Sequence, residues 1–236
     1  MSDWKNLVEI VKDNNKQLLA TKSKNITDID SATIRIDIYG GSKGNDASRI
    51  PEDGLTLLHV AAYYDSLECF AYLHLERKIP LRQPSSHSFL PLHYACWNGS
   101  TEIALYILTS DPAEAQCRVE GADQLQLLNC SFVGGDVEIV EDLLEKGAPY
   151  DHKILIHKAV CLHRVDLLIL IYQNLQNSRV SIDTPLPVKA VMEHSPESLE
   201  ILYKGKEDII SHIPGKSNDN LISLICDIDN AKKFKK

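Results

Sequence analysis

Three histidines stand in similar short sequences along the chain, and histidine is a common zinc ligand. They are His59 in Leu-Leu-His-Val, His93 in Pro-Leu-His-Tyr and His157 in Leu-Ile-His-Lys. Each is expected at the start of its own helix, so successive side chains would lie about 10 Å apart, a helix packing distance. Zinc–nitrogen bonds are only about 2 Å long, so this spacing is too wide for a shared ion. We therefore expect structural histidines and no metal site.

Two further patterns contain residue types that could carry chemistry. Gly215-Lys216-Ser217 resembles the end of a phosphate-binding loop, but Ile210 occupies the place where that motif needs its first glycine. Five acidic residues recur at intervals of about one repeat, and they are expected at helix starts, where negative charge suits the helix dipole. They are Glu68, Glu102, Glu138, Asp166 and Glu197. No nucleophile–base arrangement stands out, so we expect no enzyme activity and no cofactor.

The sequence around the first two histidines repeats itself. Residues 53–75 read DGLTLLHVAAYYDSLECFAYLHL, and residues 89–108 read FLPLHYACWNGSTEIALYIL. His59 and Glu68 both recur at the same offset (93 − 59 = 34 and 102 − 68 = 34). A period of about 33 residues with a T-P-L-H-x-A core is typical of ankyrin repeats. The chain thus resembles the ankyrin-repeat family, which implies an all-α solenoid of stacked helix-turn-helix units.

Single residues fit the two helices of such a unit. Thr56 stands where a helix N-cap is wanted, and Pro91 occupies the first turn of the second copy, where its missing N–H costs nothing. Gly99 is expected to end its helix in the left-handed conformation, and Asp65 takes that place in the earlier copy. One unit cannot bury its own apolar stripe, so stability must come from stacking.

Later units are weaker copies. Residues 125–144 form a third, and residues 155–172 and 186–203 match each other through a shared Lys-Ala-Val, 31 residues apart (190 − 159 = 31). We predict an ankyrin-repeat domain over 49–236, with repeats near 53–86, 87–122, 123–150, 151–181 and 182–216 and a partial one at 217–236.

Residues 1–48 lack the repeat core and are predicted to form an irregular N-terminal cap. Apolar spacing predicts a helix over 4–11, which 18–20 either extend or follow with a second short helix. Strict alternation predicts a short strand over 34–38. A separate small domain is the alternative.

Composition limits the class of partner. The chain has 236 residues and a formal net charge of −8, which argues against a nucleic-acid surface. No apolar run approaches the roughly 18 residues of a membrane span, and no signal peptide is present. The six cysteines are widely separated, which favours core thiols in a reducing compartment over disulfides or a metal site. We expect a monomer in the cytoplasm, with the nucleus as the alternative.

The family resemblance implies non-catalytic binding of another protein through the concave face, made by loop tips and first helices. The positions that it assigns to this face include an aromatic group and two lysines further along: Tyr63, Tyr64, Tyr94, Trp97, Asn98, Lys158 and Lys189. A partner with an apolar anchor and an acidic end would suit them. For the aromatic residues, packing is the alternative. A second hypothesis is a targeting or regulatory segment of a larger enzyme that continues beyond residue 236, and a third, an enzyme in the first fifty residues, lacks His and Cys there.

Overall fold

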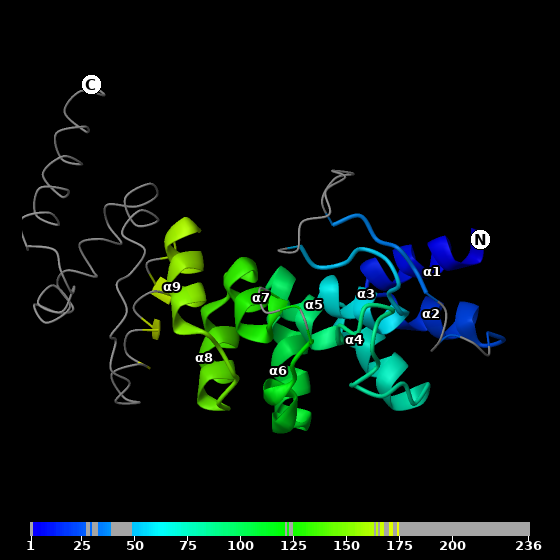
Figure 1. Cartoon of the computed structure of the whole chain (residues 1–236). Coiled ribbons are helices and arrows are strands. Elements are labelled where there is room, and N and C mark those ends of the chain that lie inside the picture. The colour runs from blue at the N-terminus through cyan, green and yellow to red at the C-terminus, as the bar shows by residue number, and fades with distance from the viewer. Residues whose placement is uncertain are drawn as a thin grey trace, which may run out of the picture. The chain divides into compact units, whose positions relative to one another are not determined.

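The structure is a computed structural model of the chain. It describes residues 2–26, 29, 33–38, 49–120, 122, 125–162, 164, 166, 167, 170, 171 and 174. Two compact units, Met1–Tyr150 and Asp151–Lys236, are each described by themselves. Within the described residues every regular element is a helix (Figure 1), which agrees with the predicted all-α class. None of these helices is long and apolar enough to cross a membrane.

The first unit consists of helix pairs stacked side by side (Figure 1). First helices contact one another in chain order, and second helices do the same. Each pair thereby covers an apolar face of the next, as in a repeat array. The pairs are α1 (Ser2–Lys12) with α2 (Lys16–Ser23), α3 (Leu57–Tyr63) with α4 (Leu67–Ala71) and its π-helical continuation η1 (Tyr72–Glu76), α5 (Pro91–Asn98) with α6 (Thr101–Ser110), and α7 (Leu127–Gly134) with α8 (Val137–Glu145). A short 3-10 helix, η2 (Pro112–Gln116), follows α6.

A left-handed residue stands between the two helices of every pair. Asn14 (φ 49°), Asp65 (φ 53°), Gly99 (φ 70°) and Gly135 (φ 75°) take this place in turn. Glycine adopts the conformation without a steric cost, and Asn and Asp tolerate it better than other side chains. The predicted equivalence of Asp65 and Gly99 is confirmed.

Two of these turn residues also reach the next pair. The Oδ1 atom of Asn14 accepts the N–H of Cys69 at 3.1 Å, and the Oδ1 atom of Asp65 accepts the N–H of Ile103 at 3.2 Å. Each donor is the third residue of the next second helix. Such donors have no partner inside their own helix, so the preceding pair supplies one. The first pair therefore joins its neighbour by the same contact as the second pair does.

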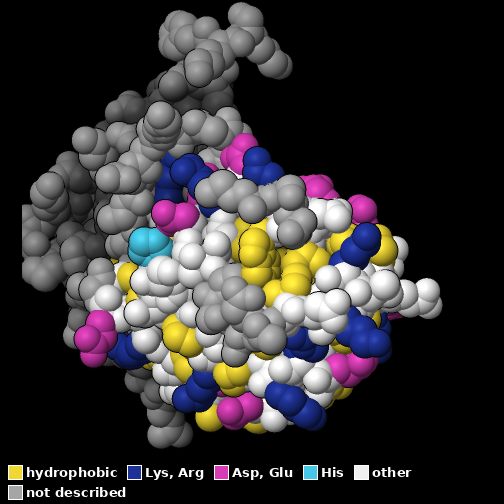
Figure 2. All heavy atoms as spheres, turned by 90° about the vertical axis from the view of Figure 1, so that its right-hand side faces the viewer, with side chains coloured by type: hydrophobic (Ala, Val, Ile, Leu, Met, Phe, Trp, Pro, Cys, Tyr) yellow, Lys and Arg dark blue, Asp and Glu magenta, His cyan; other side chains and the backbone are white. Residues whose placement is uncertain are grey.

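The first of these contacts comes from the N-terminal segment. The helix predicted over 4–11 is α1, and 18–20 belong to a separate helix, α2. The pair contacts the next one helix on helix, α1 on α3 and α2 on α4. The cap over 1–48 stays a prediction. Figure 2 looks onto this end of the unit and shows hydrophobic side chains gathered on it, with charged side chains around them.

The strand predicted over 34–38 is absent from the described residues. A single bridge joins Ile34 to Leu55, and the N–H of Ile36 then bonds the carbonyl of Glu52 at 2.9 Å. A regular antiparallel ladder would continue at Asp53, but Gly54 (φ 69°) bends the opposing segment and breaks the register. The alternating apolar and polar residues still place one side of this segment in the core, since Ile36 is 3% exposed.

The first helices approach one another most closely between α5 and α7. A Cβ atom added at Gly134 would lie 2.2 Å from the carbonyl oxygen of Cys96 and 2.5 Å from the nitrogen of Gly99. Backbone thus packs directly on backbone, and the predicted small residues Ala95 and Cys96 are fully buried beside this contact. Cys69, Cys96, Cys117 and Cys130 are free thiols.

The second unit is described only in part. Its helix α9 (His152–Cys161) buries Leu155 and Ala159. It coincides with the predicted first helix of the repeat at 151–181. The side chain of His157, Lys189, and the predicted repeats at 182–216 and 217–236 lie outside the described residues.

Candidate functional site

The first histidine joins one repeat to the next. The Nδ1 atom of His59 accepts the N–H of Thr56 at 3.2 Å and lies 2.8 Å from its hydroxyl, while Nε2 lies 2.9 Å from the carbonyl oxygen of Phe89. A carbonyl only accepts, so Nε2 carries the proton and the Thr56 hydroxyl donates to Nδ1. Burial lowers the pKa of His59 to about 4, so the ring is neutral near pH 7. This geometry agrees with the structural role predicted for His59.

The second histidine is equally buried. The Nδ1 atom of His93 accepts the N–H of Leu90 at 3.3 Å, and its ring meets that of Phe89 edge to face. Burial, and secondarily the nearby His59, lowers its pKa to about 3. Within the described residues no group of three or more His, Cys, Asp or Glu side chains could hold a metal ion.

Tyr94 belongs to the core rather than to the surface. Its side chain is 0% exposed, its ring packs edge to face on His59 at a centroid distance of 5.3 Å, and its hydroxyl donates to the carbonyl of Pro51 at 2.9 Å. The packing alternative therefore holds for Tyr94. It follows His93 directly, and the neighbouring repeat covers this side of α5 as well.

The last positions of the first helices are half-exposed. Two residues before each left-handed turn stand Lys12, Tyr63, Trp97 and Val133, and we call these four the helix-end row. Tyr64 adjoins the row, its ring 5.0 Å from that of Tyr63 at an interplanar angle of 85°. The Nζ atom of Lys12 lies 5.1 Å from the centre of the Tyr64 ring, a cation–π distance. Four successive first helices thus each present a half-exposed side chain at the same position relative to the turn, and three of the four are apolar or aromatic.

Hydrogen bonds from the following pair fix the backbone beneath this row. Asn98 Nδ2 and Ser100 Oγ both donate to the carbonyl of Tyr63, at 2.8 and 3.0 Å. That carbonyl is near the end of α3 and has no helical partner of its own, so the next repeat satisfies it. Side chains of the next repeat, close in sequence to Trp97, thus hold the carbonyl of Tyr63.

Charge around the row is balanced locally. Lys12 pairs with Glu9 at 2.8 Å, and this hydrogen bond is the main reason that the pKa of Lys12 is raised. Burial raises the pKa of Tyr63, helped by the nearby Tyr64 and Asp37. The row is thus uncharged in its centre, with one cation at its N-terminal end.

Of the predicted surface residues, the structure brings Tyr63, Tyr64, Trp97 and Asn98 together and places Tyr94 in the core. Lys158 is half-exposed on α9 in the second unit. Lys12 and Val133 extend the row and were not predicted from the sequence. Their signal is positional, because each stands two residues before a turn residue, as Tyr63 and Trp97 do.

Comparison with known proteins gives independent evidence on the repeats. Residues 16–119 match the sequence model of ankyrin repeats (3 copies), and the match begins in α2. The chain is 26% identical over 176 residues to transient receptor potential cation channel subfamily A member 1 of Drosophila melanogaster, an alignment covering 67% of this chain. It spans only 15% of the length of that relative.

A solved structure supports the same fold. The human ASB11 ankyrin repeat domain superposes with a TM-score of 0.64 at 21% sequence identity, covering 90% of this chain and 89% of that one. At this identity the likeness concerns the fold alone. Together, the match of residues 16–119 to the ankyrin-repeat model and the likeness in fold support ankyrin repeats in this chain.

Proposed function

We propose that the protein is a non-catalytic interaction module that binds another protein through the aromatic part of its helix-end row. Ankyrin repeats in general mediate protein–protein interaction. The observation that carries the proposal is the group of three half-exposed aromatic side chains on adjacent first helices, Tyr63, Tyr64 and Trp97. Tyr and Trp are enriched among the residues that dominate interface energy, because they bury much area at a low entropic cost.

Rigidity favours this surface as a binding site. The carbonyl of Tyr63 is held by two donors from the next repeat, so the aromatic group needs little ordering when a partner arrives. A pre-formed site loses less conformational entropy on binding and binds more tightly for the same contacts.

The partner that suits this surface has an apolar anchor for the aromatic group and an acidic end. Lys158 and Lys189, which stand at matching positions of later repeats in the sequence, are proposed separately as contacts for acidic groups of a partner. Binding is proposed to take place inside the cell, in the cytoplasm, with the protein as a monomer.

A second candidate function is that of a regulatory or targeting segment of a larger enzyme. The observation that favours a segment of this kind is that the Drosophila relative, a cation channel, is far longer than the part this chain matches. In that case the same aromatic group would contact another part of the longer protein.

Affinity capture with mass spectrometry tests the first proposal. Wild type, Tyr63→Ala/Trp97→Ala and the control Tyr106→Ala are compared, after circular dichroism shows that all three are folded. Tyr106 is a matched control, because it is also half-buried but lies on a second helix, against Phe70 and His74. We expect a partner that wild type and control retain and the double variant loses. Equal retention by all three would place the binding surface elsewhere.

A further inference from the structure

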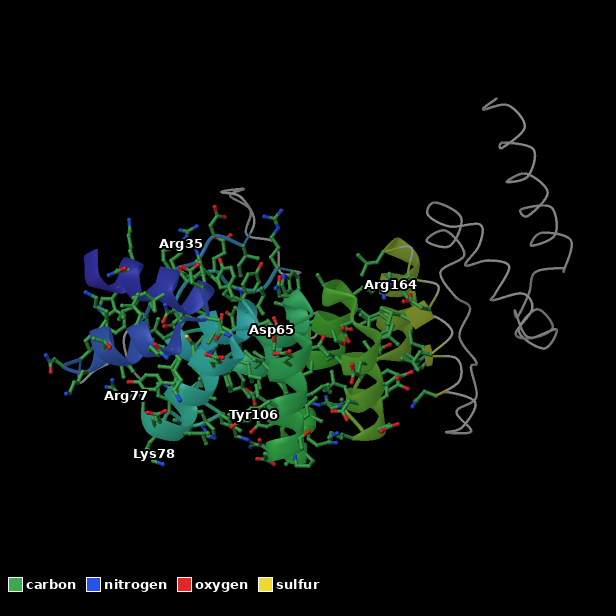
Figure 3. The ribbon with its side chains drawn as sticks, turned by 180° about the vertical axis from the view of Figure 1, so that it is seen from behind. Arg35, Asp65, Arg77, Lys78, Tyr106 and Arg164 are labelled. Atoms are coloured by element: carbon green, nitrogen blue, oxygen red, sulfur yellow. The ribbon has the colours of Figure 1, made fainter. Side chains whose placement is uncertain are left out.

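The ends of α2 and η1 are locked together on the second-helix side of the first unit. The guanidinium of Arg77 donates to the carbonyl of Ser23 at 2.8 Å and to that of Ile26 at 2.6 Å. The hydroxyl of Tyr72 also lies 3.1 Å from that of Ser23. A cation at the C-terminal end of a helix suits the free carbonyls and the dipole there. Figure 3 shows Arg77 and Lys78 at this end of η1.

The backbone of η1 departs from that of the equivalent helix in the next repeat. The N–H of Arg77 bonds the carbonyl five residues earlier, at Tyr72 (3.1 Å), whereas the equivalent Asp111 bonds Ile107, four residues earlier. Lys78 then adopts a left-handed conformation (φ 61°), which is unusual for a residue with a long side chain. Short π-helical turns occur often at functional sites. Capping of the end of α2 gives Arg77 a structural role. It gives no such role to the side chains next to Arg77.

These side chains include an exposed apolar residue. Leu75 is 52% exposed, the largest value for a large hydrophobic side chain among the described residues. Its backbone is fixed, because the Nδ1 atom of His74 bonds the carbonyl of Ile79 at 2.8 Å across the turn. Leu75 is thus held outward on an ordered segment.

Cations that form no ion pair with a described residue stand at the same two helix ends. Lys22, Lys24 and Lys78 are exposed and form no ion pair with any described residue. Arg77 donates to two carbonyls and a hydroxyl. Lys16, in contrast, is paired with Glu76 at 2.8 Å. We call Lys22, Lys24, Arg77 and Lys78 the basic corner. It draws on two elements more than fifty positions apart in a chain of net charge −8.

We propose that the basic corner and Leu75 form a second interaction surface, which binds an acidic segment of a partner protein that carries an apolar residue. Carboxylates of the segment would pair with the lysines, and its apolar side chain would cover Leu75. Charges are screened over about 10 Å at 0.1 M salt, so a short segment responds to the corner alone. An anionic bilayer or a nucleic-acid duplex extends over much of the negatively charged molecule and would be repelled.

Fluorescence polarisation with a defined probe tests this surface on the full chain. The probe is a fluorescein-labelled peptide of glutamate and leucine, compared with a glutamine and leucine peptide of equal length. The variants are Lys24→Glu/Lys78→Glu in the basic corner and Lys5→Glu/Arg118→Glu, two exposed positions elsewhere. The two double variants carry the same net charge, so only the position of the change differs.

We expect the acidic peptide to bind at low salt and more weakly as salt increases. Lys24→Glu/Lys78→Glu should reduce the affinity at least about tenfold, since two favourable pairs become repulsive, and the control pair should change it less than about threefold. Leu75→Ser should weaken binding a few-fold. The proposal is overturned if the acidic peptide does not bind, if both double variants weaken it equally, or if the glutamine peptide binds as well. Binding to phosphatidylserine vesicles in place of the peptide would overturn it in favour of a membrane surface.

Discussion

Two junctions of the first unit solve the same packing problem by different means. Where α1 and α2 meet the second pair, polar side chains make the connection, through Asn14 on Cys69 and Arg77 on Ser23. Where α5 meets α7, backbone touches backbone at Gly134, and no side chain intervenes. A repeat array can therefore be joined either by side chains that reach across or by the absence of a side chain. The backbone contact should tolerate fewer substitutions than the side-chain contacts do.

Gly134→Ala tests the tight junction and should give the largest effect. The new methyl group would meet the Cys96 carbonyl and the Gly99 nitrogen, both backbone atoms that cannot rotate away. We expect a loss of about 3 kcal/mol in the free energy of unfolding, measured by urea denaturation. Val133→Ala, one residue earlier and half-exposed, should cost less than about 1 kcal/mol. Similar losses in both variants would contradict the account of this junction.

Acid should weaken the junction between α3 and α5 that His59 holds. The pKa of His59 is about 4 in the folded chain and near 6.5 in the unfolded chain, so between these two pH values the unfolded state binds the proton and the folded state does not. Stability is therefore lost as the pH falls from 6.5 towards 4, by about 2–3 kcal/mol for this group. Urea titrations at pH 7 and pH 5 measure the loss. His59→Gln, which cannot titrate, should show a shallower pH dependence, and an unchanged one would refute this assignment.

Arg77→Ala tests the polar junction. It removes charged hydrogen bonds to the carbonyls of Ser23 and Ile26 and should cost about 2 kcal/mol. Hydrogen exchange should increase in α1 and α2 before it does so in α7. The control is Lys78→Ala, which removes an exposed side chain without an ion pair and should cost less than about 0.5 kcal/mol. Uniform exchange along the unit would mean that Arg77 does not serve this junction in particular.

Asn14→Gly should have the smallest effect. Glycine keeps the left-handed turn but removes the acceptor for the N–H of Cys69, so the loss should be about 1 kcal/mol. Asn14→Ala adds the steric cost of the left-handed conformation and should lose about 1 kcal/mol more. Thermal unfolding of the two variants separates the two contributions, and equal melting temperatures would show that the conformation costs nothing here.

Sequence reasoning succeeded where one residue type does one local task. The left-handed role of Asp65 and Gly99 and the structural role of His59 could be read from the repeat core. The pair α1–α2 was harder to identify, because its turn uses Asn14 and its helices lack the T-P-L-H core. The π-helical turn at η1 has no such signal in the repeat core, and the contact of Arg77 beside it joins positions more than fifty residues apart.

Surface positions were harder to predict than the fold for a physical reason. Residues 57–62 and 91–96 are buried without exception, because a first helix has neighbours on both sides and its own second helix behind it. Helical periodicity cannot separate core from surface in such a helix, and so Tyr94 was assigned to the face. Only positions near the ends of the first helices, such as Tyr63 and Trp97, are partly exposed to solvent. The basic corner was missed because its lysines come from two separate elements.

The direction of the contacts between pairs has a consequence for synthesis on the ribosome. Asn14, Asp65 and the carbonyl of Tyr63 are acceptors on one pair, and their donors belong to the pair that follows in the chain. The Nε2 proton of His59 likewise forms its hydrogen bond with the carbonyl of Phe89, which comes later in the chain. These groups find their partners within the protein only after the next pair has been made. Assembly thus advances with translation, and each new pair completes the one made before it.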